Sequence, residues 1–83
     1  MSYEKLKQAQ SYTVGMKQSI KLIEEGQALE VFIASDADRQ ILSRIHSLCN
    51  KMGVQVTYVD SMKQLGKVCG IEVGAAVVAL RQE

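Results

Sequence analysis

The stretch from residue 29 to residue 59 constrains the fold more than any other part of this chain. It begins with a short apolar run rich in β-branched residues, Leu29–Ala34, which is typical of a strand buried on both faces of a sheet. An amphipathic segment over residues 38–52 follows, with apolar residues at helical spacing. Residues 54–59 then place apolar and polar side chains alternately, as in a second strand. Because strands separated by helices need crossover connections, this order favours a partly parallel sheet.

The remaining segments add elements of the same two kinds. Further helices are predicted at the N-terminus (Tyr3, Leu6 and Ala9), over residues 17–25 and after the capping box that begins at Ser61, and further strands over residues 12–14 and 74–80. Three glycines, at positions 26, 53 and 70, stand where helices end. The helix–strand order, repeated four times, predicts a single domain over residues 1–83. Its fold class is α/β, a three-layer α/β/α sandwich with a four-stranded mixed sheet.

The central helix carries its own start signal. Asp36 or Ser35 can accept the first free N–H groups, and Ser35 with Asp38 resembles a capping box. We therefore expect the polar turn after Leu29–Ala34 to cap the helix that follows it.

Composition excludes several classes of protein. The chain has 83 residues, of which 47% are hydrophobic and none is Pro, so we expect a globular domain. The longest apolar run, Val73–Leu80, is far shorter than the ~20 residues that span a bilayer, and the N-terminus has no apolar signal segment. Two cysteines are too few for a disulfide scaffold. We expect a cytoplasmic protein with reduced thiols and no membrane partner.

Charge is distributed in blocks that the formal net charge of +1 conceals. Residues 1–21 carry a net charge of +3, residues 22–40 carry −4, and residues 41–83 carry +2. A total so close to zero argues against a dominant electrostatic field. The segregation nevertheless permits one basic face.

The first candidate site is the segment Gly15–Lys21. Gly15 lets the backbone approach a ligand closely, and the predicted helix directs free N–H groups and a positive dipole end outward. Lys17, Gln18 and Lys21 share one face of that helix. An amide beside ammonium groups suits a base edge next to a phosphate. On this motif alone, an ordinary solvated first turn is the simpler interpretation.

The second candidate site is the segment Leu65–Gly74. Gly70 and Gly74 bracket Ile71, Glu72 and Val73. If these residues form an exposed turn, its apolar tip indicates contact with a partner. If Ile71 and Val73 already belong to the following strand, they have only a structural role. The segment matches neither the P-loop nor the dinucleotide-binding spacing.

Catalytic and metal-ligating residues are poorly represented. We expect His46 to lie on the surface, Asp36 and Asp38 to act as helix caps, and Cys49 and Cys69 to fill the apolar interior. No nucleophile, base and orienting group can be assembled from the sequence, and no set of residues has metal-ligand spacing. We expect no catalytic residue, cofactor or metal, and therefore no enzyme.

Taken together, the helix start GMKQSIK and the later segment LGKVCGIEVGAA resemble the ribosomal protein L7Ae family of kink-turn RNA-binding proteins. The likeness is in particular to its small bacterial branch, the YbxF type, and it covers essentially the whole chain, including LEVFIASDAD and VDSMKQLGKVCG. The resemblance implies an α/β/α sandwich. It also implies a non-catalytic protein that stabilises a helix–bulge–helix RNA with tandem sheared G·A pairs.

The resemblance also implies the residues that bind RNA. Gly15, Lys17, Gln18 and Lys21 match the family's Gly-x-Asn-Glu-x-x-Lys motif, with Lys17-Gln18 in place of Asn-Glu. By resemblance, Gly15 allows close approach, Lys17 and Gln18 contact the G·A guanines, and Lys21 reaches a nearby base or phosphate. The set formed by Ile71, Glu72 and Val73 occupies the family's specificity-loop positions. Its two apolar side chains would pack against the flipped-out bulge nucleotide.

The partners implied are kink-turn RNA, either ribosomal RNA or a structured mRNA element, and the ribosome itself. We expect a cytoplasmic monomer. An alternative function retains the fold but makes the apolar loop a protein-docking module of a ribonucleoprotein particle, with incidental RNA contact.

Overall fold

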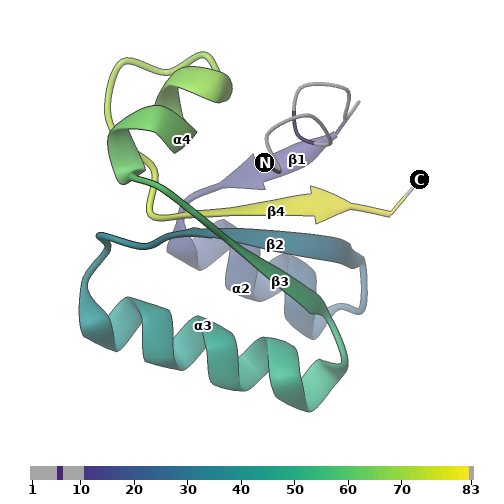
Figure 1. Ribbon diagram of the computed structural model, residues 1–83. Helices are drawn as coiled ribbons and strands as arrows, with labels where there is room; N and C mark the ends of the chain where they lie inside the picture. Colours follow the sequence, from purple (N-terminus) through teal and green to yellow (C-terminus); the bar gives the residue numbers. More distant parts are fainter. Residues whose placement is uncertain (1–5, 7–10, 83) are drawn as a thin grey trace.

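A computed structural model describes Leu6 and residues 11–82. Its strands are β1 (Tyr12–Val14), β2 (Ala28–Ala34), β3 (Gln55–Val59) and β4 (Val77–Arg81), and its helices are α2 (Met16–Glu24), α3 (Arg39–Met52) and α4 (Met62–Val68) (Figure 1). These elements follow the predicted order. Tyr3 and Ala9 of the predicted N-terminal helix lie outside the described residues, whereas Leu6 is buried in the core.

The four strands form one mixed sheet in the order β1-β4-β2-β3. Strands β2 and β3 are parallel, with Val31 opposite Val56, while β4 runs antiparallel to both β1 and β2. The segment between β2 and β3 is α3, so the predicted parallel pair joined by a helix is confirmed. The apolar run near the C-terminus is a central strand, as predicted, although it begins at Val77 and residues 74–76 precede it.

Helices cover both faces of this sheet. Helices α2 and α3 lie on one face and α4 lies on the other (Figure 1). Alternate residues of the two central strands supply two separate apolar clusters. The cluster on the α4 side contains Leu6, Phe32, Ala34, Val59, Leu65, Val78 and Leu80, and the cluster on the α2–α3 side contains Leu22, Ile23, Val31, Ile33, Ile45, Cys49, Val77 and Ala79. The predicted three-layer α/β/α sandwich is confirmed.

One residue of β2 departs from the predicted burial on both faces. Leu29 is 57% exposed, whereas the other six residues of β2 are buried. The pairing register with β4 shifts between Ala28 and Glu30, so Leu29 is the extra residue of a β-bulge. A bulge turns its extra residue away from the ladder, which explains why an apolar side chain faces solvent here.

The helix ends follow local sequence signals with one exception. Asp38 is the N-cap of α3 and accepts a hydrogen bond from the Gln40 N–H at 2.8 Å, and the α3 C-cap, Gly53, has a φ of 71°. Asp36 does not cap α3, contrary to the prediction. Its Oδ1 instead accepts from the backbone N–H of Met62, at the start of α4, at 2.8 Å. The parallel pairing of β2 with β3 brings the two turns together, because both follow the same end of the sheet.

Replacement of Asp36 tests this long-range cap. We expect Asp36→Ala to lower the free energy of unfolding by about 1 kcal/mol, because the Met62 N–H loses its side-chain acceptor. Urea denaturation measures the loss, and hydrogen exchange at the Met62 amide should accelerate. Asp60→Ala removes an exposed carboxylate nearby in the chain and serves as the control, with a change within about 0.5 kcal/mol. Equal losses in the two variants would contradict the capping role.

Candidate functional site

Both candidate segments converge at one end of the sheet. The Gly15 N–H, just before α2, donates to the Val77 carbonyl oxygen at 2.9 Å, at the start of β4. The Ala34 N–H at the end of β2 donates to the Ala76 carbonyl oxygen at 2.9 Å. The start of α2 and the α4–β4 loop therefore lie at the same end, which is on the left in Figure 1. Residues more than fifty positions apart in the sequence are brought together there.

Gly15 is required at the start of α2 for a conformational reason. Its φ of 100° and ψ of 158° lie in a region that L side chains rarely adopt, and a Cβ placed there would meet no atom within 4 Å. The space in front of Gly15 is therefore open. The first turn of α2 contains no acidic residue, and Gly15 provides no side-chain cap for its N–H groups. This helix end remains positively polarised and accessible.

The three predicted site residues on α2, Lys17, Gln18 and Lys21, are all exposed, but they line two different hollows. Ser19, Leu22 and Ile23 form the buried side of the helix, while Lys17, Gln18 and Lys21 face solvent. Lys17 lies in a hollow shared with α3, whose lining residues are Met16, Lys17, Ile20 and Arg44. Gln18 and Lys21 open onto a second hollow, lined by Thr13, Gln18, Lys21, Leu22, Glu25 and Arg81. The predicted shared face is therefore divided between two neighbouring surfaces.

The α4–β4 loop presents one apolar side chain to solvent. Val73 is 72% exposed and Glu72 is exposed, whereas Ile71 is half-buried and packs against the apolar cluster on the α4 side. Strand β4 begins at Val77, so the alternative that placed Ile71 and Val73 within the strand is wrong. The exposed-turn prediction holds fully for Glu72 and Val73. It holds only in part for Ile71, because that side chain also anchors the loop.

The loop is held against α4 through its backbone. The Ile71 N–H donates to the Gly66 carbonyl oxygen at 3.0 Å, and the Ala75 N–H donates to the Met62 carbonyl oxygen at 3.0 Å. A Cβ at Gly66 would lie 2.2 Å from the Val73 carbonyl oxygen. Gly66 is therefore the residue that allows the loop to pack directly on the helix. This role of Gly66 is not evident from the sequence, because the contact depends on how the loop folds back on α4.

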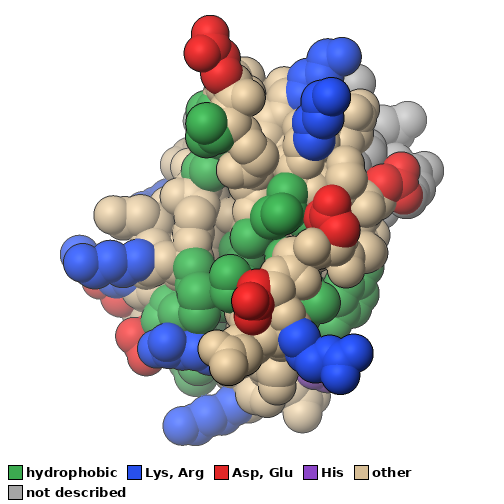
Figure 2. All heavy atoms as spheres, turned by 90° about the vertical axis from the view of Figure 1, so that its left-hand side faces the viewer, with side chains coloured by type: hydrophobic (Ala, Val, Ile, Leu, Met, Phe, Trp, Pro, Cys, Tyr) green, Lys and Arg blue, Asp and Glu red, His purple; other side chains and the backbone are tan. Residues whose placement is uncertain are grey.

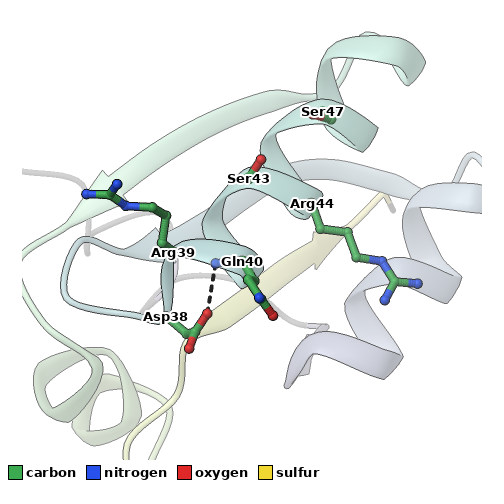
Figure 3. A pocket seen from close by; sticks show the side chains of 6 residues that line it. All are labelled: Asp38, Arg39, Gln40, Ser43, Arg44 and Ser47. Atoms are coloured by element: carbon green, nitrogen blue, oxygen red, sulfur yellow. Dashed lines mark hydrogen bonds between the residues drawn. The ribbon is translucent and has the colours of Figure 1, made fainter.

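Basic and apolar side chains occur together on this end of the molecule. Figure 2 faces it and shows hydrophobic side chains exposed between Lys or Arg and Asp or Glu side chains. Helix α3 contributes a shallow pocket lined by Asp38, Arg39, Gln40, Ser43, Arg44 and Ser47. Arg39 and Arg44 project from opposite sides of α3, and Arg44 extends toward α2 (Figure 3). Arg44 is not among the residues predicted from the sequence, because its position in the chain gives no sign that it lies beside Lys17.

Among the candidate catalytic groups, His46 and Cys49 lie in the predicted environments, whereas Cys69 is only half-buried at the edge of the apolar interior. His46 is exposed and stacks against Tyr58, with ring centroids 6.5 Å apart. Burial raises the pKa of the Cys49 thiol to about 11, so the thiol is neutral near pH 7. Burial also raises the pKa of Cys69, against the opposing effect of a Tyr12 hydrogen bond. Across Leu6 and residues 11–82, no group of three or more His, Cys, Asp or Glu side chains could hold a metal ion.

Within the part of the chain that the structure describes, no helix combines the length and apolarity needed to cross a bilayer.

Comparisons with known proteins identify similar chains. A model of the ribosomal protein L7Ae/L30e/S12e/Gadd45 family matches residues 2–83. RNA-binding protein YbxF of Geobacillus stearothermophilus is 51% identical over 80 residues, which cover 96% of this chain and 98% of that protein. RNA-binding protein BH0128 of Halalkalibacterium halodurans is 46% identical over 82 residues, or 99% of this chain and 100% of that protein.

A solved structure has a similar fold. The 15.5kD RNA binding protein of Giardia lamblia superimposes with a TM-score of 0.83 at 28% sequence identity. The match covers 89% of this chain and 62% of that one.

Proposed function

Because this chain belongs to the ribosomal protein L7Ae/L30e/S12e/Gadd45 family, as its motifs predict, we propose that it is a non-catalytic RNA-binding protein that recognises and stabilises kink-turn RNA. The observation that carries the proposal is the convergence of the α2 start and the α4–β4 loop at one end of the sheet, joined by the hydrogen bond from Gly15 to Val77. Relatives that match nearly their full length bear the name RNA-binding protein, which supports RNA as the ligand.

The geometry suits a bent RNA better than a regular duplex. The major groove of A-form RNA is too deep and narrow for side chains to read, and a kink opens it. A helix end with free N–H groups and exposed Lys17 and Gln18 can then reach base edges and phosphates. Exposed Val73 in the α4–β4 loop provides an apolar surface for a nucleotide outside the stack.

The polar side chains of α2 differ in the RNA groups that they can contact. The Gln18 amide can both donate to and accept from guanine, whereas the Lys17 ammonium only donates. Lys21 lies about one helical turn beyond Gln18 and lines the same hollow. It is suited to contact a nearby base or phosphate. A formal net charge of +1 means that recognition depends on the shape of the RNA more than on bulk attraction. Association with the ribosome, through kink-turns of ribosomal RNA, is part of this proposal.

A bending assay tests the proposal directly. A kink-turn RNA carries a fluorescent donor on one stem and an acceptor on the other, and energy transfer is followed as protein is added. We expect transfer to rise at micromolar protein or below, because a ligand that prefers the kinked conformer shifts the RNA population toward it. The control RNA has the same length but Watson–Crick pairs in place of the sheared G·A pairs, and should not bend. Absence of bending in the first RNA, or equal bending in both, would overturn the proposal.

A further inference from the structure

A groove between α2 and α3 lies directly beside the start of α2. Met16, Lys17, Ile20 and Arg44 line its first part, and Met16, Asp38, Gln40, Ile41 and Arg44 line its second part. Arg44 is the residue of α3 common to both parts. Met16, Ile20 and Ile41 are half-buried and pack against the apolar cluster on the α2–α3 side. The groove thus has an apolar floor and a cationic rim formed by two different helices.

The two cations on this rim form no ion pair with the side chains that the structure describes. Lys17 and Arg44 are both exposed, and neither forms an ion pair or side-chain hydrogen bond with any residue that the structure describes. The carboxylate of Asp38 lines only the second part of the groove, where its Oδ1 accepts from the Gln40 N–H. The first part of the groove is lined by Lys17 and Arg44 and by no acidic side chain among the described residues, which gives a local potential there that favours an anion.

The side chain of Arg44 is suited to phosphate in this setting. A guanidinium presents a planar set of donors that matches phosphate oxygens, and it stays charged at any relevant pH. Its alkyl stem can lie on apolar surface while the charged end reaches solvent, which limits the freedom lost on binding. Arg44 extends toward α2 rather than away from it (Figure 3).

We propose that Arg44 is a further RNA-binding residue, which contacts the RNA backbone phosphate beside Lys17 and extends the interface from α2 onto α3. This inference rests on the proposed function, since it takes the RNA to lie at the start of α2. The groove continues that interface without a break, because Lys17 belongs to both. In this arrangement, a phosphate next to a base contacted by Lys17 lies on the side of α2 that faces Arg44.

The matched pair Arg44→Ala and Arg39→Ala tests the inference. Both substitutions remove one exposed arginine from the first half of α3, but Arg39 projects from the opposite side of that helix. We expect Arg44→Ala to weaken binding to kink-turn RNA about tenfold and to lower the slope of log affinity against log salt concentration by about one. Arg39→Ala should change affinity less than twofold. Arg44→Lys keeps the charge and should recover part of the affinity and the full slope.

The outcomes separate this inference from the proposed function. Equal losses for Arg44→Ala and Arg39→Ala would show a general charge effect and overturn the assignment of Arg44 alone. An unchanged salt slope in Arg44→Ala would also overturn the assignment of Arg44. The proposed function would still hold in that case, provided that the wild-type protein binds kink-turn RNA. If the wild-type chain binds no kink-turn RNA, the proposed function fails and the Arg44 contact fails with it. Urea denaturation of each variant confirms that affinity is compared between folded proteins.

Discussion

Gly66→Ala is expected to destabilise the protein and to displace the α4–β4 loop, although alanine is the better helix former. In an exposed helix interior this change would stabilise by about 1 kcal/mol. Here the added Cβ would lie 2.2 Å from the Val73 carbonyl oxygen and 3.1 Å from the Gly74 Cα, and these backbone atoms must move. We expect the free energy of unfolding to fall by about 2 kcal/mol and the melting temperature by about 10 °C.

The displaced loop should also weaken RNA binding. Val73 is carried by the segment that the new Cβ pushes, so we expect about a tenfold loss of kink-turn affinity at a temperature where the variant remains folded. Gln64→Ala, at an exposed position of the same helix, is the matched control and should change neither stability nor affinity appreciably. Stability equal to or above that of the wild type in Gly66→Ala would contradict the close contact between loop and helix.

Gln18→Ala is expected to weaken binding to kink-turn RNA by between tenfold and a hundredfold while leaving the fold intact. A base contact of this kind contributes about 1–3 kcal/mol of discrimination. Gln18 is exposed on α2, and no side-chain hydrogen bond ties it to the residues that the structure describes. The free energy of unfolding should therefore stay within about 0.5 kcal/mol of the wild type. Fluorescence titration with labelled RNA measures the affinity.

Two controls test whether the loss of affinity is specific to Gln18 and to the sheared G·A bases. Gln18→Ala should lower the affinity for an RNA of the same length without the sheared G·A pairs only slightly, because the proposed contact of Gln18 is to those bases. Gln27→Ala removes an exposed amide at the opposite end of the sheet, just before β2, and should leave kink-turn affinity unchanged. Equal losses on both RNAs would remove the base-reading role of Gln18 and leave it a general contact.

The local elements were predictable because their signals act within a few residues. Asp38 and Gly53 mark the ends of α3 by their own side chain and backbone conformation. Ser61 accepts from the Gln64 N–H at 3.1 Å, as its capping-box position predicts. The exposed Leu29 was not predictable in the same way. Its exposure follows from a register shift against β4, a strand nearly fifty residues further along the chain.

The individual segments of the candidate site were predictable from the sequence, but their meeting on one surface was not. The motif around Gly15 and the loop around Val73 were both recognised, and their shared location depends on the antiparallel pairing of β1 with β4. The half-buried state of Ile71 depends on the packing of α4 against the sheet. The roles of the predicted RNA-binding residues remain predictions, which the substitutions above test.

From residue 11 onward, the amino-acid sequence by itself determined which segments are helices and strands, that they form a mixed α/β sandwich, and to which family the chain belongs. Capping side chains, glycines and hydrophobic periodicity are properties of neighbouring residues, and sequence can display them. Only the tertiary structure decided that Asp36 caps α4, that Gly66 allows the α4–β4 loop to pack on the helix, and that Arg44 lies beside Lys17. These proximities arise because the strand order β1-β4-β2-β3 and the packing of α2 on α3 bring distant residues together. No local pattern in the chain records such contacts.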